Sequence, residues 1–143
     1  MRATVTLDLP RDTASVTLGR CVIRSALKAL GVARDVCYDL ELALAEACAN
    51  VVKHATGSDA YQVTVRIEDG MCCIDVIDNG RGYDERTLRT SMPQPSAEAG
   101  RGLPLIRMLT ENARLAHHPK RGTIMHFEKT LRWESPALSS RLN

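Results

Sequence analysis

The segment Arg34–Ala55, with the sequence RDVCYDLELALAEACANVVKHA, decides the fold of this chain. Its apolar residues recur at the spacing of one face of an α-helix, and the Gly57-Ser58 pair is typical of a helix end. The expected core stripe consists of Val36, Leu40, Leu44, Ala47 and Val51. Because such a helix must bury its apolar stripe against another layer, we expect a layered domain built around it.

The residues before this segment predict a strand and a first helix. Residues 4–9 alternate polar and apolar side chains, as in a strand with one buried face. Residues 14–30 carry apolar side chains at helical spacing. Asp12 or Thr13 can cap the start of this helix, and Gly31 can end it.

The residues after it predict a hairpin and a long loop. Residues 61–67 and 71–77 are apolar enough for strands, and Glu68-Asp69-Gly70 between them favours a hairpin turn. Residues 79–102 are rich in Gly, Pro, Ser and charge. A loop this long inside a compact domain indicates a functional role.

The last third of the chain predicts a short helix and a second hairpin. Residues 103–109 form the helix, with Pro104 tolerated in its first turn. Residues 113–117 and 123–133 form the hairpin. This order of elements lacks the βαβ alternation of a doubly wound sheet. It fits a two-layer α/β sandwich, a mixed or antiparallel sheet covered on one face by helices.

Composition limits the class of protein. The 143 residues fit one domain, expected over residues 1–133, with residues 134–143 as a disordered C-terminal tail. With 44% hydrophobic and only 3% aromatic residues, the core must be aliphatic. A net charge of +2 is too small to argue for nucleic acid or an anionic membrane. Because neither a signal peptide nor a membrane helix is visible, we expect a cytoplasmic protein.

Cysteine chemistry is not indicated as the function. The five cysteines are Cys21, Cys37, Cys48, Cys72 and Cys73. Their odd number and their spacing argue against a disulfide framework or a zinc site, so we expect small buried or half-buried side chains in a reducing cytosol. Cys72 and Cys73 should point to opposite faces of their strand.

Three polar clusters are candidates for chemistry. Glu46, Asn50 and His54 follow one another at i, i+4 and i+8 on the long helix and therefore share a side of it. A carboxylate and an amide oxygen one turn apart can hold a hard cation or order a water molecule. An ordinary solvated helix face explains the same spacing.

The other two clusters are rich in glycine. Asp78 ends an apolar strand and is followed by Gly80 and Gly82. Its carboxylate can accept a hydrogen bond from an amine such as that of adenine. The same residues are also typical of an ordinary turn. Gly100-Arg101-Gly102-Leu103 precedes a helix, where free N–H groups suit phosphates, although a hinge fits as well. Neither a Walker loop nor a dinucleotide-binding fingerprint is present.

Taken in this order, the three clusters resemble the N, G1 and G2 boxes of the Bergerat-fold ATPases, a superfamily that includes histidine kinases and anti-sigma-factor serine kinases. The resemblance covers about residues 4–132, and Gly122-Thr123 before the last strand also fits. The size of the chain points to the stand-alone anti-sigma-factor kinases. A histidine kinase would need a dimerising helix pair with a phosphoacceptor histidine, for which there is no room.

The resemblance implies roles for individual residues. Asn50 would coordinate Mg²⁺, and Glu46 would be the general base that takes the proton from a serine or threonine hydroxyl. Asp78 would hold the adenine amine, with Gly80 and Gly82 near the base.

The same resemblance implies the phosphate contacts. Gly100 to Leu103, including Gly102, would bind the phosphates, and Lys53 would reach one of them. Arg101 would stabilise charge on the transferring phosphoryl group. Thr123 would support the adenine pocket. His54 is expected to support the helix, while His117, His118 and His126 are interpreted as surface or packing residues.

The family implies a function and partners. The chain would use ATP and Mg²⁺ to phosphorylate a small anti-sigma-factor antagonist, and it would otherwise sequester a sigma factor. A homodimer is implied, and the first strand could pair at a sheet edge. A rival hypothesis is a regulatory binding module in which ATP orders Asp84–Ala99 without phosphate transfer. The least favoured alternative is a purely structural domain.

Overall fold

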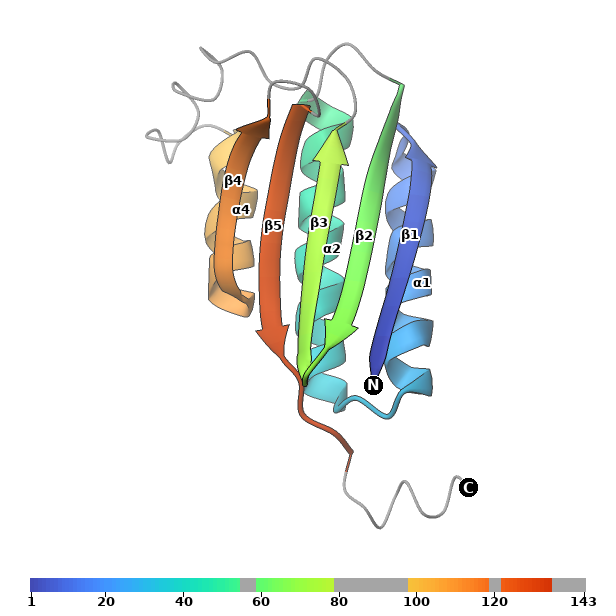
Figure 1. Cartoon of the computed structure of the whole chain (residues 1–143). Coiled ribbons are helices and arrows are strands. Elements are labelled where there is room, and N and C mark those ends of the chain that lie inside the picture. The colour runs from blue at the N-terminus through green and yellow to red at the C-terminus, as the bar shows by residue number, and fades with distance from the viewer. Residues whose placement is uncertain (55–58, 79–97, 119–121, 135–143) are drawn as a thin grey trace.

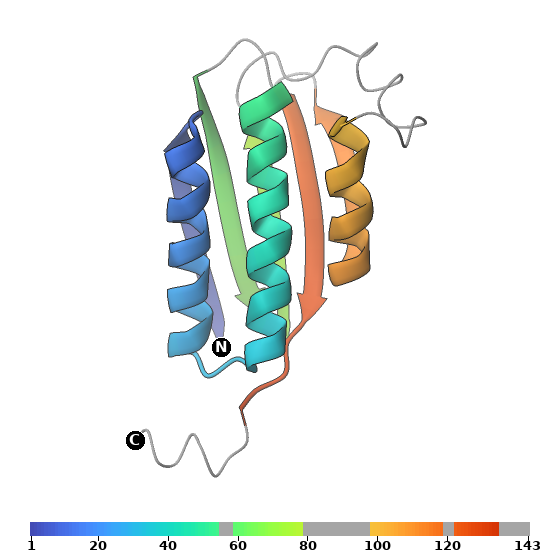
Figure 2. The same cartoon turned by 180° about the vertical axis from the view of Figure 1, so that it is seen from behind.

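The computed structural model describes residues 1–54, 59–78, 98–118 and 122–134, which form one antiparallel sheet with helices on one face (Figure 1, Figure 2). The helices are α1 (Thr13–Ala29), α2 (Arg34–His54) and α4 (Glu98–Leu109). The strands are β1 (Arg2–Pro10), β2 (Ala60–Glu68), β3 (Met71–Asp78), β4 (Glu111–His118) and β5 (Gly122–Thr130). Within these ranges, no helix is long and apolar enough to span a bilayer.

The sheet order is β1-β2-β3-β5-β4, and every neighbouring pair is antiparallel. The prediction of a two-layer α/β sandwich is therefore confirmed, and of the two sheet types that it allowed, the sheet is antiparallel. The last hairpin does not simply follow the first along the sheet. Its second strand, β5, lies between β3 and β4, next to the centre of the sheet.

The core lies between α2 and the middle strands. Figure 2 shows α2 across the centre of the sheet, between α1 and α4. The predicted stripe of α2 is buried, as are the inward side chains of the strands beneath it, such as Val63 and Ile74. Only two aromatic side chains, Tyr61 and Phe127, are among the buried residues that the structure describes, so the core is aliphatic as predicted.

Local signals in the sequence fix the turns. Asp12 caps α1, because its side chain accepts a hydrogen bond of 2.9 Å from the backbone N–H of Ser15. Gly31 follows the end of α1 with a positive φ of 82°. Asp69 and Gly70 have φ values of 53° and 74°, as a tight two-residue hairpin between β2 and β3 requires.

The start of α4 differs from the prediction. The helix begins at Glu98 rather than Leu103, so Pro104 lies inside the helix and not in its first turn. The prediction was wrong because two glycines and a proline have low helix propensity, whereas tertiary packing decides the outcome. Ile106 is completely buried, and α4 packs against α2.

One cysteine also departs from the prediction. Cys21 is exposed, because the buried positions of α1 include Gly19 and Ile23 and a side chain midway between them points to the opposite side of the helix. The other four thiols are buried or half-buried, and all five are free. Cys72 is buried and Cys73 is half-buried, which agrees with their predicted placement on opposite faces.

The sheet face away from the helices carries a histidine between two carboxylates. Nδ1 of His126 lies 2.6 Å from Oδ1 of Asp75, and its Nε2 lies 2.6 Å from Oε2 of Glu128. The hydrogen bond from His126 lowers the pKa of Glu128, with a smaller contribution from Asn112. His126 is therefore a packing residue, as interpreted, with an ion-pair network around it.

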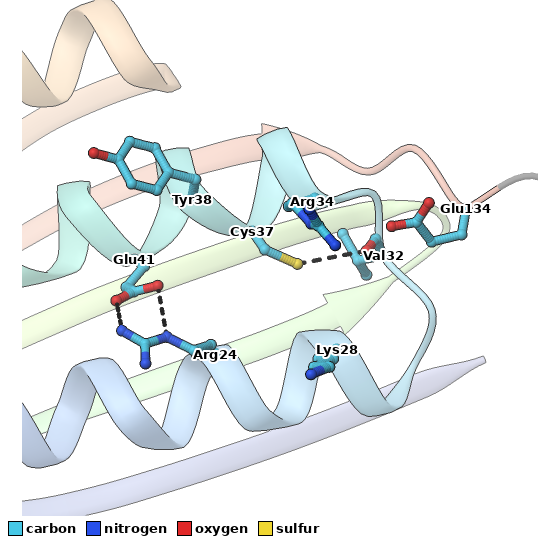
Figure 3. Close-up of a pocket in the computed structure, with 8 residues that line it drawn as sticks. All are labelled: Arg24, Lys28, Val32, Arg34, Cys37, Tyr38, Glu41 and Glu134. Carbon is cyan, nitrogen blue, oxygen red and sulfur yellow. Dashed lines mark hydrogen bonds and ion pairs between the residues drawn. The ribbon is translucent and has the colours of Figure 1, made fainter.

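A buried carboxylate joins the first two helices. Glu41 of α2 is 6% exposed and accepts hydrogen bonds from two arginines of α1. Oε1 is 3.2 Å from Nε of Arg20, and Oε2 is 3.0 Å from Nε of Arg24 (Figure 3). The hydrogen bond from Arg24 is the main reason that the pKa of Glu41 lies below its ordinary value, and it outweighs the desolvation that opposes it.

Replacement of Glu41 by Gln should therefore destabilise the protein at neutral pH by about 1.5–3 kcal/mol, the usual range for hydrogen bonds to charged groups. The pKa of Glu41 is lower in the folded state, so its stabilisation is complete above the unfolded value of 4.5 and is lost as pH falls through the folded value. Urea unfolding at pH 7 and near pH 3 measures both free energies.

The difference between the wild type and Glu41→Gln should shrink in acid. Glu68→Gln is the matched control, because Glu68 forms an exposed pair with Arg2 and such pairs contribute at most about 1 kcal/mol. A Glu41→Gln penalty that is the same at both pH values would contradict the assignment.

Candidate functional site

The candidate site lies at one end of the molecule, which we call the site pole and define by Asn50, Lys53, Asp78, Leu103 and Thr123. The C-terminal ends of α2 and β3 and the first residues of β5 and α4 meet there, uppermost in Figure 1. These elements are far apart in sequence, and the antiparallel sheet together with the packing of α4 on α2 brings them to the same end.

The last two turns of α2 carry the first predicted cluster. Glu46 and Asn50 are half-buried one turn apart, and they lie beside the buried positions Ala47 and Val51. The buried stripe fixes the rotation of the helix, so these two side chains point along the rim of the core rather than into it. Lys53 is exposed at the end of the helix.

The ends of β3 and β5 carry a buried polar pair. The β3–β5 ladder ends at the pair Ile77–Ile124, and the next residues at the site pole are Asp78 and Thr123. Asp78 is fully buried and Thr123 is 3% exposed. By the alternation of the strands, both residues belong to the side that faces the helices. A buried carboxylate is costly unless donors reach it, so Asp78 is suited to bind the amine of a ligand.

The first turns of α4 contain the third cluster. The structure places Gly100, Arg101 and Gly102 within α4, whereas the sequence predicted them as a loop in front of a helix. The first four N–H groups of a helix have no partner within it. In α4 these belong to residues 98–101, so the N–H groups open to an anion lie slightly earlier in the chain than predicted.

The structure says less about the remaining predicted site residues, Gly80, Gly82 and His54. Gly80 and Gly82 lie outside the described residues. Nε2 of His54 is buried and has no hydrogen-bond partner among the residues that the structure describes. The described part of the chain contains no group of three or more His, Cys, Asp or Glu side chains that could hold a metal ion.

The structure adds one residue that the sequence did not indicate. Arg11, in the turn between β1 and α1, donates a hydrogen bond of 3.3 Å from Nε to the carbonyl oxygen of Val52. That carbonyl is among the last four of α2, which lack partners inside the helix, and a cation is favourable there. Arg11 therefore holds the end of α2 next to Asn50 and Lys53. A single arginine in a turn carries no motif that could have predicted this contact.

Comparison with known proteins assigns this arrangement to a family. Residues 9–129 match the family described as histidine kinase-like ATPase domain. A serine-protein kinase RsbW from Listeria monocytogenes serotype 4a (strain HCC23) is 32% identical over 126 residues, which cover 80% of each chain. Another serine-protein kinase RsbW, from Bacillus cereus (strain AH820), is 28% identical over 123 residues, which cover 79% of this chain and 77% of that one.

A solved structure shares the fold. The crystal structure of the RsbU and RsbW domains of a Mycobacterium tuberculosis protein superimposes with a TM-score of 0.70 at 20% identity. The match covers 93% of this chain and 35% of the larger one, so this chain corresponds to about a third of that protein. The fold, the family match and the relatives agree with the resemblance drawn from the three clusters. The chain therefore belongs to the histidine kinase-like ATPase family and, within it, to the RsbW-type anti-sigma-factor kinases.

Proposed function

We propose that this protein is a Mg·ATP-dependent serine/threonine kinase that acts in the cytoplasm as an anti-sigma factor. It would phosphorylate an anti-sigma-factor antagonist and sequester a sigma factor. The observation that carries the proposal is the pair Glu46 and Asn50, one turn apart on α2, at the same pole as the buried Asp78 and Thr123. We take Glu46 as the base and Asn50 as the cation ligand of this site.

The residues at the site pole suit a nucleotide. The carboxylate of Asp78 would accept a hydrogen bond from the adenine amine, supported by Thr123 and by Gly80 and Gly82. The phosphates would lie against the first turns of α4 near residues 100–103, because the unpaired N–H groups at the start of this helix, residues 98–101, favour anions. Lys53 would contact them from the end of α2.

A magnesium ion at this site would depend on Asn50. Mg²⁺ takes six oxygen ligands, and it commonly takes them from phosphates, water and one or two side chains. One amide oxygen from Asn50 fits this pattern. When bound, the ion would neutralise charge on the phosphates, to which Arg101 would add a further positive charge.

Glu46 would perform the proton transfer. The hydroxyl oxygen of the substrate serine or threonine would form a bond to the γ-phosphorus as the bond from that phosphorus to the bridging oxygen breaks. Glu46 would take the hydroxyl proton, and ADP would leave with the bridging oxygen. Asn50 and Lys53 lie near the C-terminal end of α2, and they would orient the phosphates for this transfer.

Nucleotide binding gives the first test. Mg·ATP at about 100 times its dissociation constant should add ~2.7 kcal/mol of stability and raise the melting temperature by about 5–15 °C. Mg·GTP should give a much smaller shift, because guanine presents a carbonyl where adenine presents the amine. Asp78→Asn should reduce the ATP shift and the preference for ATP, as measured by thermal denaturation. Equal shifts with ATP and GTP would contradict the role of Asp78.

Phosphate transfer gives the second test. Glu46→Gln should lower transfer of labelled phosphate from ATP to the antagonist of the same organism by roughly 10²–10⁴-fold, because the base is lost. The thermal shift with Mg·ATP should remain. Glu68→Gln, a matched change at the far end of β2, should transfer phosphate like the wild type. If Glu46→Gln and the wild type transfer at the same rate, Glu46 is not the base.

A second candidate function is an ATP-gated binding module without phosphate transfer. The same residues support this alternative. ATP would be bound by Asp78, Asn50 and the start of α4, and Glu46 would not be needed for binding. In this case the wild type would show the thermal shift and no transfer. ATP would change its affinity for a sigma factor, and Glu46→Gln would bind the sigma factor unchanged.

The proposed homodimer would use the edge of the sheet at β1. β1 is an edge strand, and an apolar cavity of about 260 Å³ lies between it and α1. Every side chain that lines this cavity is apolar, including Val5, Val22 and Ala26. An uncovered apolar sheet edge promotes association, so a second copy of the chain would cover it.

Val22→Asp should therefore convert the dimer to a monomer, because it places a charge at the apolar interface. Sedimentation equilibrium measures the change as a rise of the dissociation constant by at least about tenfold. Thr17→Asp, exposed on a side of the same helix that points away from Val22, is the matched control and should leave the dimer intact. A Val22→Asp variant that stays dimeric would place the interface elsewhere.

A further inference from the structure

Two aromatic side chains are exposed at the end of the molecule opposite the site pole. The chain contains one tryptophan, three tyrosines and one phenylalanine. Tyr61 and Phe127 are fully buried, whereas Tyr38 is 62% exposed and Trp133 is 48% exposed. In a protein with so few aromatic residues, exposure of two of them at one place is not required by the core. Exposed aromatic side chains are typical of the energetically dominant positions of protein interfaces.

The backbone around Trp133 is held firmly. The segment after β5 runs antiparallel to the α1–α2 connection, with a bridge between Val32 and Trp133. The N–H of Ala33 donates to the carbonyl of Arg132 at 2.7 Å, and the N–H of Glu134 donates to the carbonyl of Gly31 at 2.8 Å. The backbone of Trp133 is therefore held in place relative to the α1–α2 connection.

A groove runs past these side chains. A cavity of about 300 Å³ lies between the lower ends of α1 and α2, as Figure 3 shows, and a hollow of about 950 Å³ continues it toward Trp133. The two share Lys28, Arg34, Tyr38 and Glu134 among their lining residues. We call this continuous surface the basal groove and define it by Lys28, Arg34, Tyr38, Trp133 and Glu134.

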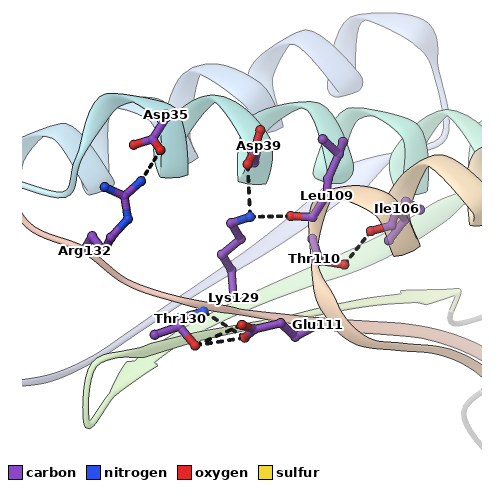
Figure 4. Close-up of polar contacts among 9 residues, drawn as sticks. All are labelled: Asp35, Asp39, Ile106, Leu109, Thr110, Glu111, Lys129, Thr130 and Arg132. Atoms are coloured by element: carbon purple, nitrogen blue, oxygen red, sulfur yellow. Dashed lines mark hydrogen bonds and ion pairs between the residues drawn. The ribbon is translucent and has the colours of Figure 1, made fainter.

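The basal groove carries an excess of one unpaired positive charge, because the cations Lys28 and Arg34 share it with the carboxylate of Glu134. Lys28 and Arg34 are exposed, and in the described part of the chain neither side chain has a salt bridge or a hydrogen bond. The nearby acids of α2 are already engaged: Figure 4 shows Asp35 paired with Arg132 and Asp39 with Lys129. Cations left without partners next to exposed aromatic rings favour an acidic ligand with apolar side chains.

We propose that the basal groove is a docking surface for an acidic segment of a partner protein. A carboxylate of that segment lies between Lys28 and Arg34, and an apolar side chain packs against Tyr38 and Trp133. The surface is at the opposite end from Asn50 and Asp78, so the partner binds with the site pole accessible. The inference does not depend on phosphate transfer by the protein.

The charges and the shape select this occupant over others. A nucleic acid binds through a row of phosphate contacts, and the two unpaired cations of the groove together with a net charge of +2 offer it few. A small anion would fill the basic cavity but would leave the hollow beside Trp133 empty. Residues 135–143 of the chain itself contain no Asp or Glu and so do not match the cations.

Trp133 supplies the measurement, because it is the only tryptophan of the chain. The probe is a synthetic peptide that alternates Asp or Glu with Leu or Phe and contains no Trp or Tyr. Its titration into the full-length protein should give a saturable change in tryptophan fluorescence, confirmed by calorimetry. A peptide with Lys and Arg in place of the acids should give none.

The variants test each part of the groove. The double change Lys28→Glu and Arg34→Glu should weaken peptide binding by at least about tenfold, and Tyr38→Ala should weaken it by a similar factor. Arg66→Glu is the matched control on the exposed face of β2 and should bind the peptide like the wild type. Circular dichroism melts verify that all variants are folded.

Four results with the full-length chain and its variants would overturn the proposal. They are no saturable binding of the acidic peptide, equal weakening by Arg66→Glu, equal binding of the basic peptide, and saturation by free glutamate or inorganic phosphate at the same concentration as by the peptide. A chain truncated after Glu134 provides the final comparison. If truncation raises peptide affinity by about tenfold or more, the C-terminal residues are the occupant of the groove and the proposal is wrong.

Discussion

Burial of the apolar stripe of α2 against the centre of the sheet is the constraint on which the rest of the structure depends. Leu40 and Leu44 are essentially inaccessible, and full burial of one such side chain contributes about 1.5–3 kcal/mol. Once this stripe faces β3 and β5, the 3.6-residue period of the helix fixes where every other side chain points. Glu46 and Asn50 then lie at the rim of the core, where they are shielded from water on one side and open on the other.

The second constraint is the position of β5 between β3 and β4. It extends the sheet so that the end of β3 and the start of β5 are neighbours, which brings Asp78 and Thr123 together beneath the last turns of α2. The site pole is thus assembled from four element ends, and the hydrogen bond from Arg11 to Val52 fastens the end of the helix that carries Asn50. The chemistry is concentrated where elements end, because backbone groups there have no partners within their own element.

The opposite end of the molecule is built differently. Glu41 with its two arginines joins α1 to α2, and the short ladder between the α1–α2 connection and the segment after β5 closes the base. These contacts stiffen the frame and leave Lys28, Arg34, Tyr38 and Trp133 on its surface. The protein therefore presents two chemically distinct ends, one with acids and amides around a helix terminus and one with cations around aromatic rings.

The sequence by itself determined the elements whose signals are local: the α2 stripe, a cap at Asp12 or Thr13 before α1, and the hairpin turn at Asp69 and Gly70. It also determined the candidate chemistry, because the residue types and their order along the chain carry the family resemblance. Only the tertiary structure decided the neighbours of β5, the early start of α4, the exposure of Cys21 and the partners of Glu41 and His126. The physical reason is distance along the sequence. Periodicity and turn geometry depend on residues that are close together in the chain. The β3–β5 pairing and the contacts of Glu41 join residues that are far apart, and only the packing of the whole chain selects these contacts.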